Sequence, residues 1–398
     1  MLTSIAIIFL TGLFLGAVFG KLRLPSLIGF ILTGILIGPY AANLIDESIL
    51  GIAADLRQIA LVIILTRAGL SLNLEDLKRV GRPAVLMCFV PACFEMLGVV
   101  LLAPGLLGVT RLDAAIIGSV IAAVSPAVVV PRMIRLINEG YGKKHSIPQL
   151  ILAGAAVDDV FVIVVFTAFT GLAATGEAIA ATDFLQIPVS IAVGIAVGCL
   201  VGAGQVWFYK KFHMRDSVKL LIMLSLAFLM LELQDQIADF LPMSGLLAIM
   251  SIAIMINRRY PVLAKRIQSK YNKLWVAAEL MLFVLVGATV DMEYALTAGV
   301  AAILLVCAAL LFRMAGVFVC VTGTKLTPKE RLFCMVSYTP KATVQAGIGA
   351  VPLAMGLSCG QTVLTVAVLS ILITAPFGAV CMDNLYGKLL EKEENEHK

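Results

Sequence analysis

The sequence predicts an all-α polytopic membrane protein with about 13 transmembrane helices, two of them interrupted near the middle of the membrane. Three observations lead to this prediction. The composition is too apolar for a soluble protein, basic residues fall in alternate loops, and prolines beside polar residues interrupt two of the apolar stretches.

The composition places the chain in the membrane class. Of its 398 residues, 61% are hydrophobic and only 14% are charged, whereas a soluble protein carries roughly 25% charged residues. The eight cysteines show no CxxC spacing, and the three histidines lie in predicted loops or in the tail. We therefore expect no resident metal ion, no cofactor and no nucleic-acid partner.

The apolar stretches are divided into spans on the basis that a membrane helix needs about 20 residues. The first stretch is interpreted as a retained span, because no basic segment precedes it. The tenth and eleventh spans are separated only by the polar segment Asp291–Glu293. The predicted spans lie near residues 2–20, 24–44, 48–72, 82–108, 112–137, 146–172, 183–211, 217–232, 240–257, 274–292, 294–322, 329–354 and 360–386.

The loop charges support this division and orient the chain. Alternate loops and the tail hold 25 of the 30 lysine and arginine residues, whereas the opposite loops hold only Arg111. Because basic loops stay in the cytoplasm, we predict an N-terminus outside and a C-terminus in the cytoplasm. The membrane is predicted to be the cell (inner) membrane.

Polar side chains of several spans converge on one depth. Five of them lie about 12 residues from the cytoplasmic end of their span, or roughly 18 Å at the helical rise. Arg313 starts closer to that end but reaches the same level. The five are Glu95, Ser125, Asp158, Asp159 and Lys341.

The adjacent pair Asp158 and Asp159 is the strongest functional signal, since a carboxylate at this depth costs about 3 kcal/mol or more. Membrane proteins keep such groups when they bind an ion or a proton. Glu95 and Arg313 are interpreted differently, as a mutual ion pair that holds two helices together. Lys341 is expected to neutralise negative helix ends.

Prolines break two spans at this same depth. The fifth contains Ser125-Pro126 and then Pro131, and the twelfth contains Thr339-Pro340-Lys341. Proline removes a backbone donor, and free backbone groups are tolerated at mid-membrane only around a cavity. Spans five and twelve cross in opposite directions, which is typical of an inverted-repeat transporter.

Glycines at every fourth position mark two further spans, the first (Gly12, Gly16, Gly20) and the seventh (Gly194, Gly198, Gly202). Such spacing allows close helix approach. We interpret it as packing within one molecule, with a dimer contact through the first span as the second interpretation.

Two segments resemble the monovalent cation/proton antiporter superfamily, and specifically its NHA-type sodium/proton antiporters. They are AAVSPAVVVPRMIRL with GYGKKHSIPQLILAGAAVDDV (Ala122–Val160) and SYTPKATVQAGIG (Ser337–Gly349), and TRAGLSL (Thr66–Leu72) supports them. The resemblance implies an inverted repeat of thirteen or fourteen helices in a homodimer, with a six-helix core that moves against a dimerisation domain. The expected division is 1–72 and 217–292 for dimerisation and scaffold, 82–172 and 294–386 for the two core halves, 183–211 for a linker helix and 387–398 for a cytoplasmic tail.

The resemblance also implies roles for single residues. Asp159 would be the carboxylate that binds the cation and the proton, with Asp158 as its partner and Ser125 as a contributor at the crossing. Lys341 would balance the helix dipoles. Many relatives carry a lysine where Arg313 stands, and that lysine pairs with the first aspartate.

The predicted function is therefore secondary active exchange of sodium or lithium for protons, not an enzymatic reaction. Burial and a second carboxylate both favour the protonated form of an aspartate, so a metal cation and a proton compete for one site. A sodium-coupled symporter of an organic anion is the main alternative. An intramembrane aspartyl protease would need aspartates on separate helices, and a passive cation channel would lack proton coupling.

Overall fold

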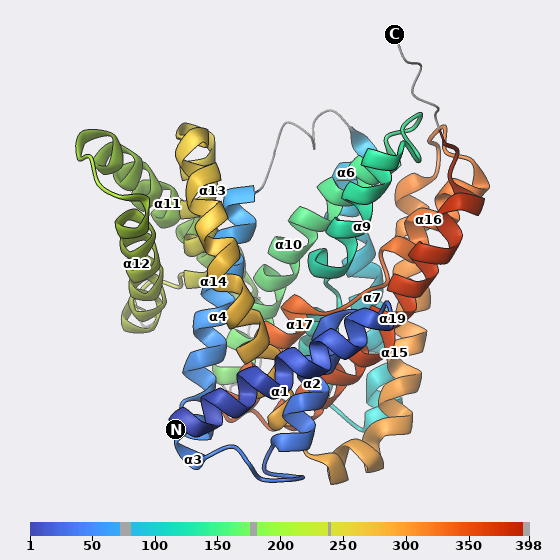
Figure 1. Ribbon diagram of the computed structural model, residues 1–398, viewed down its shortest axis with the longest axis horizontal. Helices are drawn as coiled ribbons and strands as arrows, with labels where there is room; N and C mark the ends of the chain where they lie inside the picture. Colours follow the sequence, from blue (N-terminus) through green and yellow to red (C-terminus); the bar gives the residue numbers. More distant parts are fainter. Residues whose placement is uncertain (72–80, 176–180, 238–239, 393–398) are drawn as a thin grey trace. The chain divides into compact units, whose positions relative to one another are not determined.

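The computed structural model describes residues 1–71, 81–175, 181–237 and 240–392, which are almost entirely helical and contain no β-strand (Figure 1). The first part of the chain forms helices α1 (Leu2–Lys21), α2 (Ser26–Ile37), α3 (Glu47–Gly51), α4 (Ala53–Ser71), α6 (Arg82–Met87), α7 (Val90–Leu107), α8 (Arg111–Ile121), α9 (Pro126–Glu139) and α10 (Ile147–Thr175). The rest forms α11 (Ala181–Lys211), α12 (Asp216–Ile237), α13 (Gly245–Arg259), α14 (Pro261–Ala288), α15 (Met292–Val321), α16 (Pro328–Ser337), α17 (Thr343–Ile348), α18 (Val351–Ala354) and α19 (Gly360–Leu389).

Length and composition identify the membrane-crossing elements. Eight helical stretches of the described residues are long and apolar enough to cross a membrane, and two shorter apolar helices, at Ser26–Ile37 and Thr343–Ala354, accompany them. A helix lies within each of the predicted spans. The all-helical membrane class is confirmed, whereas a count of thirteen crossings stays a prediction.

Helix α14 differs most from its predicted bounds, because it begins at Pro261 and not near residue 274. Its first part is a basic segment that hydropathy cannot detect, and proline suits the first turn of a helix. At its other end the predicted break is found. Helix α14 ends at Ala288 and α15 begins at Met292, with the backbone amide of Glu293 bonded to the Asp291 carboxylate at 2.9 Å.

Both predicted interruptions are present, although one proline acts differently from the prediction. The chain is unwound at residues 122–125 and 338–342, between α8 and α9 and between α16 and α17. Pro126 occupies the first position of α9, where no donor is required. Pro131, which was expected to interrupt the same span, lies inside α9 and the helix continues past it.

The chain contains two compact units. Unit 1 comprises residues 1–54, 73–166 and 282–398, and unit 2 comprises residues 55–72 and 167–281. Both interrupted helices and all six charged or polar residues singled out at mid-membrane depth belong to unit 1. The functional division into core, linker and dimerisation segments stays a prediction.

Glycines bring helices of each unit close together. In unit 2, a Cβ on Gly198 would lie 2.3 Å from the carbonyl oxygen of Ala248, so the α11 and α13 backbones touch. In unit 1, a Cβ on Gly16 would meet the Phe30 ring of α2 at 2.4 Å. These glycines of the two spaced sets therefore serve packing within one molecule, as predicted.

Candidate functional site

The two unwound segments meet each other within unit 1. The backbone amide of Ser125 donates to the carbonyl oxygen of Pro340 at 2.8 Å. Ser125 and Lys341, one in each segment, are both only 1% exposed. Unwound backbone leaves amides and carbonyls without helical partners, so buried side chains must satisfy them.

The side chains of Gln345 and Thr374 make hydrogen bonds to several of these backbone groups. The Gln345 side chain accepts from the amide of Ala342 at 2.8 Å and donates to the carbonyl of Ala123 at 2.8 Å, so it connects the two segments. The Thr374 hydroxyl of α19 accepts from the backbone amide of Lys341 at 2.8 Å. These bonds hold the crossing in one arrangement, since a buried backbone group without a partner costs about 1–3 kcal/mol.

Close packing of α7 against α15 places Glu95 opposite Arg313. A Cβ on Gly98 would lie 2.6 Å from the Phe312 ring, and one on Gly316 would lie 2.8 Å from the Cα of Pro91. These two glycines flank the level of the ion pair on their helices. Two helices that approach this closely can exclude water from the charges between them.

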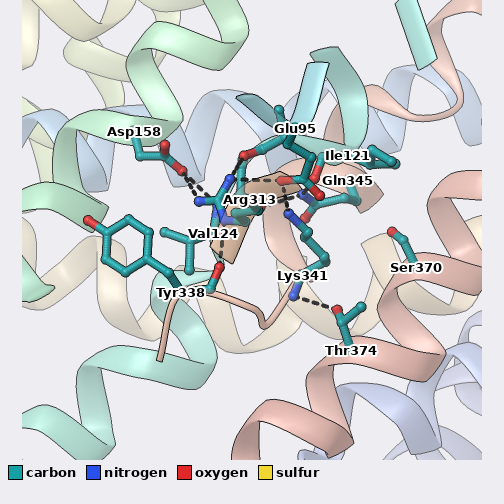
Figure 2. Close-up of polar contacts among 12 residues, drawn as sticks. Glu95, Ile121, Val124, Asp158, Arg313, Tyr338, Lys341, Gln345, Ser370 and Thr374 are labelled. Atoms are coloured by element: carbon teal, nitrogen blue, oxygen red, sulfur yellow. Dashed lines mark hydrogen bonds and ion pairs between the residues drawn. The ribbon is translucent and has the colours of Figure 1, made fainter. Parts of the chain in front are cut away.

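Arg313 is the centre of the buried charge cluster (Figure 2). Its guanidinium donates to Glu95 at 2.9 Å and to Asp158 at 3.0 Å, and the side chain is fully buried. It also donates to the backbone carbonyls of Tyr338, at 2.5 Å, and of Ala122. The expected pairing of Glu95 with Arg313 is present, and Asp158 shares the same arginine.

Lys341 completes this cluster by donating to Glu95 at 2.5 Å. Its amine is therefore directed to a carboxylate, whereas the predicted balancing of helix dipoles stays untested. The carboxylate of Asp158 also accepts from the amide of Val124 in the first unwound segment at 2.7 Å. Two acids, Glu95 and Asp158, are thus matched by two bases, Arg313 and Lys341.

Asp159 stands apart from this balanced cluster. It is 6% exposed, and its Oδ1 atom is buried with no hydrogen-bond partner in the described part of the chain. Neighbouring helical residues project about 100° apart, so Asp159 cannot share the direction of Asp158. An unmatched buried carboxylate is costly, and it can be neutralised by a proton or by a cation.

Other oxygen atoms of unit 1 are also buried and lack partners among the described residues. They include the Ser125 hydroxyl, the second Asp158 oxygen and the Tyr338 hydroxyl. Hydroxyl and carboxylate oxygens suit hard cations. Ser125 takes part in the crossing through its backbone, and among the described residues no bond joins its hydroxyl to Asp159.

Two of the residues that hold the crossing together, Gln345 and Thr374, were not identified from the sequence. Gln345 lies inside the quoted SYTPKATVQAGIG segment, so the motif contained the signal although no role was assigned to it. Thr374 lies in an apolar span without any distinguishing pattern. Gly154 of α10 was also missed. A Cβ at this position would meet the Tyr338 side chain, and the only signal in the sequence is that Gly154 lies one turn before Asp158.

Comparisons with known proteins identify the family of the chain. Residues 5–382 match the family model described as sodium/hydrogen exchanger, transmembrane. The human sodium/hydrogen exchanger 9B2 is 33% identical over an alignment that covers 100% of this chain and 76% of that protein. The mouse sodium/hydrogen exchanger 9B2 is 32% identical, with 99% and 75% covered.

The fold also has a solved counterpart. The sodium proton antiporter MjNhaP1 from Methanocaldococcus jannaschii at pH 8 superposes with a TM-score of 0.84, at 20% identity and with 98% of each chain covered. At that identity the likeness concerns the fold alone. It is the inverted-repeat antiporter fold with two crossed discontinuous helices that the sequence predicted.

The family model, the relatives and the fold together define a multi-pass membrane protein of the monovalent cation/proton antiporter superfamily. Within that class, the match over most of the chain shows that this protein belongs to the sodium/hydrogen exchanger family. These relatives are named as exchangers of sodium and hydrogen ions, which is a transport function.

Proposed function

We propose that this protein exchanges Na⁺ or Li⁺ for H⁺ by alternating access, with Asp159 as the group that both ions occupy in turn. The observation that carries the proposal is the contrast between two neighbouring carboxylates. Asp158 is held by Arg313 at 3.0 Å, whereas Asp159 is buried and its Oδ1 atom has no hydrogen-bond partner in the described part of the chain. Asp159 is therefore the acid that still requires a counter-charge.

The bound cation takes oxygen ligands from the crossing. Asp159 supplies the charge, the Ser125 hydroxyl supplies a neutral ligand, and the second oxygen of Asp158, which has no hydrogen-bond partner among the described residues, is a further candidate ligand. Na⁺ and Li⁺ are hard ions that favour such oxygen donors. Protonation of Asp159 removes the negative charge that holds the cation, so the two ions cannot be bound together.

Transport then needs a movement that opens this site to one side at a time. The unwound segments are interlocked by Ser125, Pro340 and Gln345, so the crossing moves as one rigid body. The balanced cluster of Glu95, Asp158, Arg313 and Lys341 travels with it as a neutral group. Only the ion bound at Asp159 changes during the cycle. When Asp159 is ionised and binds neither ion, the crossing carries an uncompensated negative charge, so this form should change its access from one side to the other least readily.

The protein is proposed to lie in the cell membrane as a homodimer, with its N-terminus outside and its C-terminus in the cytoplasm. The alternation of basic loops supports the orientation. The family match favours exchange over sodium-coupled symport of an organic anion. Proton release driven by Na⁺ in the absence of any organic solute distinguishes these two functions.

The test is dequenching of a pH-sensitive dye in proteoliposomes, with Na⁺, Li⁺ and K⁺ added in turn. We expect Asp159→Asn to reduce exchange to the level of empty vesicles, because the amide can neither hold a cation nor release a proton. The wild type should need more Na⁺ at lower pH, up to about tenfold more per pH unit, since one proton competes with one cation.

The matched control is Asp46→Asn, the same chemical change at an exposed acid that caps α3. Asparagine also caps helices well, so this variant should exchange at the wild-type rate. Exchange by Asp159→Asn at the native rate would show that another group binds the ions.

A further inference from the structure

One peptide unit of the first unwound segment lies between Gln345 and Asp158. Its carbonyl, that of Ala123, accepts from the Gln345 side chain at 2.8 Å, and its amide, that of Val124, donates to the Asp158 carboxylate at 2.7 Å. A trans peptide unit is planar, and its carbonyl and amide point in opposite directions. Gln345 therefore holds one edge of the plane whose other edge contacts Asp158.

The side-chain amide of Gln345 has only one orientation that satisfies its neighbours. It is fully buried, and its oxygen accepts from the backbone amide of Ala342 at 2.8 Å. A backbone amide can only donate and a carbonyl can only accept, so the side-chain nitrogen must face the carbonyl of Ala123. The same nitrogen lies 3.5 Å from the carbonyl of Ile121 at the end of α8. A flipped amide would lose the bonds on both sides.

The interruption of the helix makes this contact necessary. Residues 122–125 are not helical, so the turns that would fix the peptide planes of a regular helix are missing here. Arg313 donates to the carbonyl of Ala122, and Gln345 donates to the next carbonyl along the chain. The direction of the Val124 amide therefore depends on the bond that Gln345 makes to the carbonyl of the same peptide unit.

The Val124 amide decides which oxygen of Asp158 stays free. It donates to Oδ2, and Arg313 donates to the same atom. Oδ1 is left buried without a hydrogen-bond partner among the described residues, as is Oδ1 of Asp159. With the arginine alone, either oxygen of Asp158 could take the single bond. Two donors on one oxygen fix the rotation of the carboxylate.

We propose that Gln345 is a positioning residue for cation binding. Through the peptide unit of Ala123 and Val124 it holds the Asp158 carboxylate so that Oδ1 stays available as a ligand. This role rests on the proposed function, in which the cation binds at Asp159 with Asp158 as a further ligand. Gln345 does not touch the ion, so its loss should weaken cation binding more than it slows transport of a bound cation.

The experiment measures Na⁺-driven proton movement in proteoliposomes over a range of Na⁺ concentrations at one pH, which gives an apparent KM and a maximal rate. The first variant is Gln345→Met, whose side chain has about the same length but neither donates nor accepts. We expect its apparent KM for Na⁺ to rise about tenfold, the factor that loss of one buried hydrogen bond implies. The maximal rate should change less than the KM.

A second variant, Gln345→Asn, keeps the test decisive if Gln345→Met does not fold. Asparagine is one methylene shorter, so it cannot reach Ala123 across the crossing. It can still accept from the amide of Ala342, because the equally short Asp113 accepts from the amide of Thr110 at the start of α8. The first turn of α17 therefore keeps its bond, and the apparent KM should still rise.

Two further variants separate positioning from stability. Thr374→Val removes the bond to the backbone amide of Lys341 in the other unwound segment. It should lower the thermal unfolding midpoint in detergent, as the Gln345 variants do, but raise the KM less. Gln268→Asn makes the same change as Gln345→Asn at a partly exposed position of α14 in unit 2, and it should behave as the wild type does.

Two outcomes would overturn the role of Gln345 while exchange itself stands. A wild-type KM in Gln345→Asn would mean that Asp158 does not need this peptide unit. An equal rise of the KM in Thr374→Val would reduce Gln345 to a general support of the crossing. Wild-type vesicles that move no protons in response to Na⁺ or Li⁺ would contradict the proposed exchange, and the role of Gln345 with it.

Discussion

At the scale of single residues, Arg313 makes more hydrogen bonds than a lysine at the same position could make. Its planar guanidinium has five donors, and these reach two carboxylates and two backbone carbonyls, including that of Tyr338. A lysine offers three donors around one point. The arginine therefore holds Glu95 and Asp158 together, where the resemblance to antiporters with a lysine suggested a single partner.

The first residue-scale prediction concerns removal of this charge. Arg313→Gln leaves two buried acids with only Lys341 as a base, and loss of one partner from a buried ionic group costs about 3–5 kcal/mol. We expect the thermal unfolding midpoint in detergent to fall markedly. Arg313→Lys should lie between this variant and the wild type, because it keeps the charge but loses donors.

Arg135→Gln is the control for that measurement. Arg135 is 47% exposed and pairs at the surface with Glu139 of α9 at 2.9 Å and with Asp383 of α19 at 3.7 Å, and exposed ion pairs contribute about 0–1 kcal/mol each. A loss of stability in Arg313→Gln no larger than that in Arg135→Gln would mean that the buried cluster does not stabilise the fold.

At the scale of elements, the contact between α10 and the second interruption decides where the aspartates lie. A Cβ on Gly154 would come 2.0 Å from the Tyr338 hydroxyl and 2.9 Å from the Met87 Cβ. Gly154 lies one turn before Asp158 on α10, on the same face. Absence of a side chain at this position thus lets the phenol lie beside the helix that carries the proposed site.

This contact predicts a coupled pair of substitutions. Gly154→Ala should lower stability by about 1–3 kcal/mol, the usual cost of overpacking a core, because the added methyl meets a rigid phenol. Tyr338→Phe removes the hydroxyl that the methyl meets. The double variant should therefore recover part of the loss, which a double-mutant cycle of unfolding midpoints measures.

The outcome is informative in either direction. An additive double variant would show that Met87 or the backbone, and not the Tyr338 hydroxyl, limits the space at Gly154. Gly105→Ala is the control, since no atom lies within 4 Å of the position where its Cβ would be. It should be neutral or slightly stabilising, because alanine favours a helix over glycine.

At the scale of the whole molecule, the distribution of basic residues predicts the orientation in the membrane. Alternate loops and the tail carry 25 of the 30 lysines and arginines. Reporter fusions test the resulting topology. A fluorescent protein fused after residue 398 should be bright and alkaline phosphatase fused there should be inactive, because the C-terminus is predicted to be cytoplasmic.

A phosphatase fusion after Thr110, in a loop of the opposite side, should be active. The reverse pattern at both positions would invert the predicted topology, and equal activity at both would contradict the division into spans. Immunoblots of each fusion control for its expression, so that an inactive reporter is not confused with an absent one.

Local patterns were enough to predict much of the fold and the members of the charge cluster. The breaks at Pro126 and Pro340 follow from the chemistry of proline, which acts within one or two turns. The shared depth of Glu95, Asp158 and Lys341 follows from the constant rise of a helix. The prediction that Pro131 interrupts the same span was wrong. Whether a helix continues past a proline depends on contacts with residues that are distant in the sequence.

The sequence by itself determined the membrane class, the interrupted helices and the level at which the charges meet, because each depends on a short stretch of chain. Only the tertiary structure decided which charges pair. Arg313 is separated from Asp158 by 155 positions and from Glu95 by 218, and their meeting depends on how α7, α10 and α15 rotate and pack. That rotation leaves Asp159 outside the cluster around Arg313, with an Oδ1 atom that has no hydrogen-bond partner among the described residues.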